Sequence, residues 1–260
     1  MVTAVCNVFI NSEFKLGLFK ETFPRVYAIS DNWLINIRGK YREDVTAYIK
    51  ENFSDSAENC KFFFNLYDDD WAKSTHEMLQ KSKYEHIYIF LEDHFLLKSL
   101  EDFRNIVSDM SKNKIDYFQY SFFNVGLHVN SIEKTFPDFT DYFFSFILTL
   151  DNLKKIRSDY SNFFPYSLAS ISSKRYFLRL LELEKKVLIK APVIFQEILE
   201  KTFFRYPKNR FFWSFLNNII EKIGFRFVIY SPTTPFNLEK SLFDFNKQLM
   251  PIRVGVLREE

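Results

Sequence analysis

An unbroken apolar run over residues 87–91, Ile-Tyr-Ile-Phe-Leu, is the feature of this chain that most limits its fold. A run without polar alternation is typical of a strand covered on both faces, as in a parallel sheet between helices. The run ends abruptly in Glu92, Asp93 and His94. Ligands of open α/β sheets bind just beyond the carboxyl ends of the strands, so these side chains are candidates for binding or proton transfer. A strand that simply reaches water before a helix over 97–110 would show the same residues, and this alternative stays open.

Around this run, the first half of the chain alternates apolar strand patterns with helical patterns. A loop or short helix is expected over residues 11–20, and Pro24 is expected to close that segment. We expect further strands at residues 2–10, 26–30, 34–37, 61–66 and 117–123, and helices at residues 43–52, 71–81 and 99–111. Such alternation predicts an α/β fold with a mostly parallel central sheet flanked by helices.

The second half of the chain, from about residue 124, is rich in aromatic residues and less regular. Its expected elements are a strand at 139–149, a short helix at 151–157, a helix at 174–186 that follows the polar residues 170–173, a helix at 211–223 and a strand at 225–230. Residues 231–260 show no clear pattern. We therefore expect one domain over residues 1–230, with residues 231–260 as a C-terminal tail that packs on it.

Composition narrows the classes of protein to which the chain can belong. Only 5 of the 260 residues are glycine and no GxGxxG or P-loop pattern occurs, which argues against Rossmann dehydrogenases and P-loop enzymes. The net charge of +2 is too small to predict nucleic acid as a partner. Cys6 and Cys60 lack the spacing of a zinc site, so we expect free thiols in a reducing cytoplasm.

Hydropathy predicts a cytoplasmic protein that does not span a membrane. No signal-peptide pattern opens the chain, and its apolar runs fall far short of the roughly 20 residues that cross a bilayer. Residues 203–206 and 210–213 mix aromatic and basic side chains. Three interpretations of these two segments stay open: a helix core with a solvated face, a patch at the inner face of a membrane, or a surface that stacks on sugars.

The order of these elements resembles the GT-A class of nucleotide-sugar glycosyltransferases, closest to its family-2-like members. The likeness is carried by the strand at 2–9, Ser30-Asp31, Arg38-Gly39, the helix at 71–79, residues 87–94 and residues 171–174. Residues 87–94 resemble the strand that ends in the acidic DxD motif, which here is Glu92-Asp93-His94. The resemblance implies a nucleotide-binding half at about residues 1–123 and an acceptor half at about residues 124–230.

The resemblance also implies roles for the polar residues of the nucleotide-binding half. Asp31 and Arg38 would contact the nucleotide, with Glu92 beside them at the ribose or diphosphate. Asp93 and His94 would hold a divalent cation, Mn²⁺ or Mg²⁺. Histidine suits Mg²⁺ poorly, and an enzyme without metal would need Arg or Lys to neutralise the leaving diphosphate.

The implied activity is the transfer of a sugar from a nucleotide-sugar donor to a glycan or lipid-linked acceptor, as in the synthesis of surface polysaccharides. Glu197 resembles the catalytic base of the acceptor half and Asp93 is a second catalytic candidate, although an ordinary glutamate on a helix surface is the simpler interpretation of Glu197. Two other functions stay open. A sugar nucleotidyltransferase usually has a glycine-rich loop after its first strand, where this chain has only Gly17. A non-catalytic protein on a transferase-like fold would bind a glycan or a membrane surface.

Overall fold

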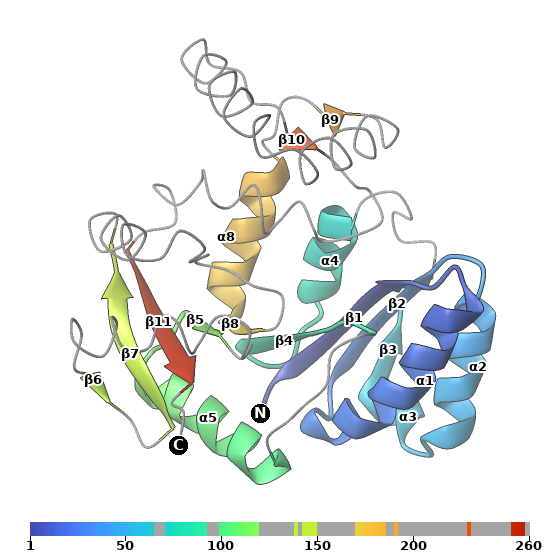
Figure 1. Ribbon diagram of the computed structural model, residues 1–260, viewed down its shortest axis with the longest axis horizontal. Coiled ribbons are helices and arrows are strands. Elements are labelled where there is room, and N and C mark those ends of the chain that lie inside the picture. Colours follow the sequence, from blue (N-terminus) through green and yellow to red (C-terminus); the bar gives the residue numbers. More distant parts are fainter. Residues whose placement is uncertain are drawn as a thin grey trace, which may run out of the picture.

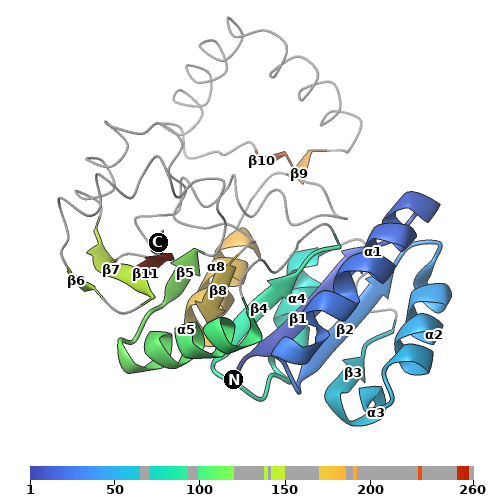
Figure 2. The ribbon, with the colours of Figure 1, turned by 60° about the horizontal axis from the view of Figure 1, so that its bottom comes forward.

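The computed structural model describes residues 1–64, 71–92, 99–119, 138–139, 142–149, 170–185, 190–191, 228–229 and 251–257. These residues form an α/β structure in which helices cover both faces of a large mixed sheet (Figures 1 and 2). Within this part of the chain, no helix is both long enough and apolar enough to cross a membrane.

The elements of the described residues follow one another as strand–helix units through the first half of the chain. The helices are α1 (Glu13–Val26), η1 (Tyr27–Ile29, a 3-10 turn), α2 (Arg42–Asn52), α3 (Ser56–Asn59), α4 (Trp71–Leu79), α5 (Leu100–Lys112) and α8 (Lys174–Lys185). The strands are β1 (Thr3–Phe9), β2 (Trp33–Arg38), β3 (Cys60–Phe62), β4 (His86–Phe90), β5 (Tyr117–Gln119), β6 (Asp138–Phe139), β7 (Phe143–Leu148), β8 (Ser170–Ser173), β9 (Lys190–Ala191), β10 (Val228–Ile229) and β11 (Ile252–Leu257).

The large sheet has the strand order β3-β2-β1-β4-β8-β5-β11-β7-β6, and β9 and β10 form a separate parallel pair. The first four strands are parallel to one another, as expected. Beyond them, β8 is antiparallel to both β4 and β5, and β7 is antiparallel to β11 and β6. The expectation of a mostly parallel sheet is therefore right for the first half of the chain only, and the sheet as a whole is mixed.

The alternation of side chains along β1 shows how the sheet becomes the middle of three layers. Ala4, Cys6 and Val8 pack with apolar residues of α1, α2 and α5, whereas Val5 packs with α4 and α8 on the opposite face. Because successive side chains of a strand point to opposite faces, a continuous apolar run is what a strand between two helical layers requires.

The segment before β2 differs from the sequence prediction. No strand covers residues 26–30, because α1 continues through Pro24 to Val26 and the 3-10 turn η1 follows. A proline inside a helix deprives the carbonyl four residues earlier of its partner. Here that carbonyl belongs to Lys20, and it accepts a hydrogen bond from the Tyr48 hydroxyl at 3.1 Å. The buried residues of α1 recur at helical spacing, so packing stabilises the helix across the proline.

Two strands of the large sheet come from segments that the sequence did not mark as strands. Residues 170–173 form β8 between β4 and β5, rather than a lead into α8. β11, from the range expected to be a tail, lies between β5 and β7. Asp116 connects this strand to the sheet: its backbone N–H donates to the Arg253 carbonyl at 2.8 Å, and its carboxylate accepts from the Arg253 N–H at 3.1 Å. The helices expected at 151–157 and 211–223 lie outside the described residues.

Candidate functional site

The carboxyl ends of β1, β2 and β4 meet at one edge of the sheet, which we call the carboxyl edge. The register pairs Phe9 of β1 with Arg38 of β2 and Cys6 of β1 with Phe90 of β4. The chain leaves β1 toward β2 on one side and later returns to β4 on the other side. Such a reversal of strand order opens a crevice at the carboxyl ends of the strands, where open α/β sheets bind ligands.

Glu92 lies two residues beyond β4 and is held there from two directions. Its backbone carbonyl accepts a hydrogen bond from the Thr22 hydroxyl of α1 at 2.9 Å. Its carboxylate lies 2.5 Å from the ammonium of Lys15, which also lies 3.5 Å from the Phe9 carbonyl. The side chain of Glu92 is only 11% exposed, whereas that of Lys15 is 39% exposed. The first turn of α1 therefore delivers a positive charge to the ends of β1 and β4.

Arg38 supplies a second positive charge at the same edge. It is the last residue of β2 and has no exposed surface. The central carbon of its guanidinium lies 5.9 Å from the centre of the Phe9 ring, within the range of a cation–π contact. Lys15 and Arg38 thus both lie against Phe9, one at its backbone and one at its ring.

Gly39 makes the tight turn that brings the ends of β1 and β2 together. Its φ is +91°, and a Cβ at this position would lie 2.6 Å from the Ile10 carbonyl oxygen. That oxygen accepts a hydrogen bond from the Tyr41 N–H at 3.1 Å, and the Ile10 N–H donates to the Arg38 carbonyl at 2.9 Å. Only glycine fits this close approach without strain.

A hollow of about 400 Å³ opens beside this turn, and we call it the edge hollow. Its lining residues are Phe9, Gly39, Lys40, Arg42 and Glu43. Two of these residues are cationic and one is acidic, and the Phe9 that lines it is the residue that Lys15 and Arg38 contact. Basic side chains grouped at strand ends suit an anionic ligand such as a phosphate.

Asp31 does not share this edge with Arg38 and Glu92. It precedes β2, and its carboxylate accepts hydrogen bonds from the Lys83 ammonium at 3.0 Å and the Tyr84 hydroxyl at 2.9 Å. Burial raises the pKa of Asp31, but the hydrogen bonds from Tyr84 and Lys83 outweigh burial and hold the pKa below its ordinary value. The prediction of a strand over 26–30, which placed Asp31 at a carboxyl end, is wrong, and Asp31 lies at the amino ends of the strands.

Asp93, His94 and Glu197 lie outside the described residues, as do residues 203–213, so their predicted roles stay predictions. Among the described residues, no group of three His, Cys, Asp or Glu side chains converges as a metal site would require. Glu92, the first position of the expected motif, is engaged by the Lys15 ammonium.

A buried amide network links β1 and β2 to α4, and sequence reasoning missed it. The Asn7 side-chain amide donates to Ser74 Oγ at 2.7 Å and Thr75 Oγ1 at 2.8 Å, and its oxygen accepts from Asn36 at 3.1 Å. The Trp71 indole N–H donates to the Asn7 carbonyl at 2.8 Å. The signal was present, since Asn7 and Asn36 are polar residues within two apolar runs. The network fixes the first turn of α4 on the sheet.

Comparisons with known proteins find similarity at the level of structure. No protein-family model matches the chain, and a search of curated proteins finds no match. Among solved structures, the chain is similar to the crystal structure of S. aureus TarS 1–349, with 12% sequence identity and a TM-score of 0.42. The similarity covers 71% of this chain and 49% of that one, so the chain spans about half the length of that structure. At this level, the similarity assigns neither a family nor an activity.

Proposed function

We propose that the chain is a GT-A-type glycosyltransferase that moves a sugar from a nucleotide-sugar donor to a glycan or lipid-linked acceptor. The observation that carries the proposal is the grouping of cations at the carboxyl edge. Lys15 and Arg38 lie against Phe9, and Phe9 lines a hollow together with Lys40 and Arg42. A nucleotide-sugar presents a diphosphate, and cations fixed before it binds stabilise the charge that grows on that group as the sugar leaves.

The strand order supports a donor site at this edge. The crevice of an open α/β sheet forms where the strand order reverses, and here the reversal lies between β1 and β4. Phe9 stands at the end of β1, and Glu92 lies two residues beyond β4. The antiparallel β8 then begins the second half of the sheet, next to β4. A donor bound between β1 and β4 would leave the second half for the acceptor.

In the proposed mechanism, basic residues of this chain stabilise the negative charge on the leaving diphosphate. Lys15, whose side chain is partly exposed, would turn from Glu92 toward the diphosphate, and Arg38, buried against Phe9, would add positive charge behind it. Glu92 would keep the Lys15 ammonium in position before the donor arrives. Glu197 is the proposed base that takes the proton of the acceptor hydroxyl, with Asp93 as the second candidate. A lipid-linked acceptor would bring the protein to the inner face of a membrane.

The connection after β1 disfavours a sugar nucleotidyltransferase. Only residues 10–12 separate β1 from α1, and Ser12 already caps the helix through its hydroxyl, which accepts from the Lys15 N–H at 3.3 Å. This short connection has no room for the glycine-rich loop of that class. A non-catalytic binding protein would share the site but not the chemistry, so the test must separate binding from turnover.

Thermal unfolding of the wild-type chain with UDP-, GDP- and CMP-sugars, each with and without Mn²⁺, tests the proposal. A donor that binds the folded chain raises its melting temperature by mass action. We expect one nucleotide class to do so, and slow hydrolysis of the same donor to distinguish an enzyme from a binding protein. If no donor raises the melting temperature under either condition, the proposal fails.

A further inference from the structure

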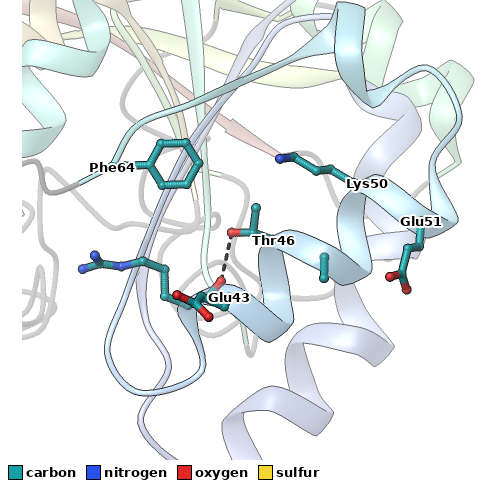
Figure 3. A pocket seen from close by; sticks show the side chains of 7 residues that line it. Glu43, Thr46, Lys50, Glu51 and Phe64 are labelled. Atoms are coloured by element: carbon teal, nitrogen blue, oxygen red, sulfur yellow. Dashed lines mark hydrogen bonds between the residues drawn. The ribbon is translucent and has the colours of Figure 1, made fainter.

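A second, larger hollow of about 640 Å³ lies between one face of α2 and Phe64, which follows β3 (Figure 3). We call it the α2–Phe64 hollow. Its lining residues are Arg42, Glu43, Thr46, Ala47, Lys50, Glu51 and Phe64. The six from α2 recur every three or four residues, so they share one face of the helix. Figure 3 shows Thr46 and Lys50 on the side of α2 that faces the Phe64 ring.

Phe64 exposes a large aromatic surface in this hollow. The residue is 57% exposed, although most described aromatic side chains of this chain pack in the core. Its ring lies nearly parallel to that of Phe62, with the centroids 6.3 Å apart and the planes 13° apart. The ammonium of Lys50 lies 5.4 Å from the centre of the Phe62 ring. Phe64 therefore presents an exposed apolar ring in the hollow, beside the Phe62 ring that Lys50 contacts.

Among the described residues that line the hollow, the charges are balanced. Arg42 and Lys50 supply two cations, and Glu43 and Glu51 supply two carboxylates. A phosphate or a nucleic acid backbone would meet both carboxylates, and a basic peptide would meet both cations. The balance therefore favours a neutral ligand that offers both donors and acceptors.

The hydrogen-bonding groups in the hollow suit vicinal hydroxyls. Arg42 donates from Nε to the Ile37 carbonyl at 2.9 Å, which orients its planar guanidinium. The Thr46 hydroxyl donates to the Arg42 carbonyl at 2.9 Å, so its oxygen is left to accept. Carboxylates of Glu43 and Glu51 accept from hydroxyl groups, and the flat apolar face of a sugar ring matches an aromatic ring.

From these features we infer that the α2–Phe64 hollow binds a neutral sugar unit of a glycan, with the C–H face of the ring on Phe64 and its hydroxyls on α2. The volume lies within the range of small-molecule sites, roughly 300–1,000 Å³. The hollow shares Arg42 and Glu43 with the edge hollow. Binding of the sugar does not rest on the proposed function, but a glycan in this hollow would run toward the proposed donor site.

Saturation-transfer-difference NMR on the full chain tests the inference, with neutral trisaccharides of glucose, galactose, mannose and N-acetylglucosamine as probes. At least one trisaccharide is expected to receive saturation at its ring C–H protons. Phe64→Ala should weaken the signal at least fivefold, and Phe64→Tyr should keep it. Ala47→Trp, which fills the hollow from α2, should also abolish it. Phe14→Ala is the matched control, because Phe14 is a 74% exposed phenylalanine that does not line the hollow.

The inference is overturned if no trisaccharide receives saturation, or if Phe64→Ala and Phe14→Ala behave alike. A preference for inorganic phosphate over the neutral sugars at this hollow would overturn it as well. Circular dichroism of each variant shows that the chain is folded. Sugar binding without any donor-induced rise in melting temperature would defeat the nucleotide-sugar proposal and leave this inference standing, so the two failures are distinguishable.

Discussion

The parallel strands β3, β2, β1 and β4 have one acid–lysine pair at the carboxyl edge and another at their amino ends, which we call the amino edge. The two pairs differ in their surroundings. At the carboxyl edge, Lys15 and Glu92 are 2.5 Å apart with side chains 39% and 11% exposed. At the amino edge, Lys83 and Asp31 are 3.0 Å apart with side chains 56% and 39% exposed. The first pair lies beside a hollow and further cations, whereas the second is more exposed to water, which weakens an ion pair.

At the amino edge, the polar groups form hydrogen bonds with one another. The Thr3 hydroxyl donates to the Asn32 side chain at 2.8 Å, and the Lys83 N–H donates to the same oxygen at 3.0 Å. The Tyr84 N–H in turn donates to the Thr3 hydroxyl at 3.0 Å. The polar groups of this edge thus join the turns before β2 and β4. The difference between the edges is that only the Lys15–Glu92 pair is desolvated at the carboxyl ends of the strands, where we propose the donor site.

The largest effect on stability is expected at the turn of the carboxyl edge. Gly39→Ala places a Cβ 2.6 Å from a backbone oxygen at positive φ, so it should lower the free energy of unfolding by about 3 kcal/mol. Gly17→Ala is the control, because a Cβ there meets nothing within 4 Å and should stabilise α1 by about 0.5–1 kcal/mol. Urea denaturation measures both. Equal effects of the two substitutions would show that the turn is not under this constraint.

The two carboxylates should differ when each is made neutral. Glu92→Gln removes a buried charge-assisted hydrogen bond and should lower the free energy of unfolding by about 1–3 kcal/mol. Asp31→Asn acts on an exposed pair and should cost less than about 1 kcal/mol. Chemical denaturation of both variants at neutral pH tests the contrast, and a larger cost for Asp31→Asn would reverse the comparison.

The smallest effect concerns pH at the amino edge. Because hydrogen bonds hold the folded pKa of Asp31 below its ordinary value of 3.8, the ionised carboxylate stabilises the fold above that value. This contribution is lost as the pH falls through the folded pKa. The difference in free energy of unfolding between wild type and Asp31→Asn should therefore be present at neutral pH and shrink below pH 3.8. A difference that grows on acidification would contradict the assignment.

The elements that can be predicted from the sequence are those in which apolar residues recur with the period of a helix or a strand. β1, β2, β4 and α5 were predicted because their apolar residues recur within a few positions. The four-residue, serine-rich β8 has no such period. β11 forms only because it meets β5 and β7, which come from far earlier in the chain.

The predictable part of the site follows the same division. Arg38 and Glu92 directly follow the apolar runs at 34–37 and 87–91 in the sequence, so their edge could be predicted. Lys15 could not, because its partner Glu92 is 77 residues away and α1 was not expected to begin at a site. Asp31 is misplaced by the sequence pattern, because residues 26–30, Val-Tyr-Ala-Ile-Ser, have the apolar character of a short strand although they end α1 and form η1.

Calorimetric titration of the most stabilising nucleotide-sugar into wild type, Lys15→Met and Lys83→Met tests the central claim most directly. Both substitutions remove one ammonium from an acid–lysine pair, and only one of the pairs lies at the carboxyl edge. A charge-assisted contact with phosphate is worth roughly ten- to hundredfold in affinity, so Lys15→Met should lose at least about tenfold while Lys83→Met binds like wild type. Unchanged affinity in Lys15→Met, or an equal loss in both variants, would contradict a diphosphate site at the carboxyl edge.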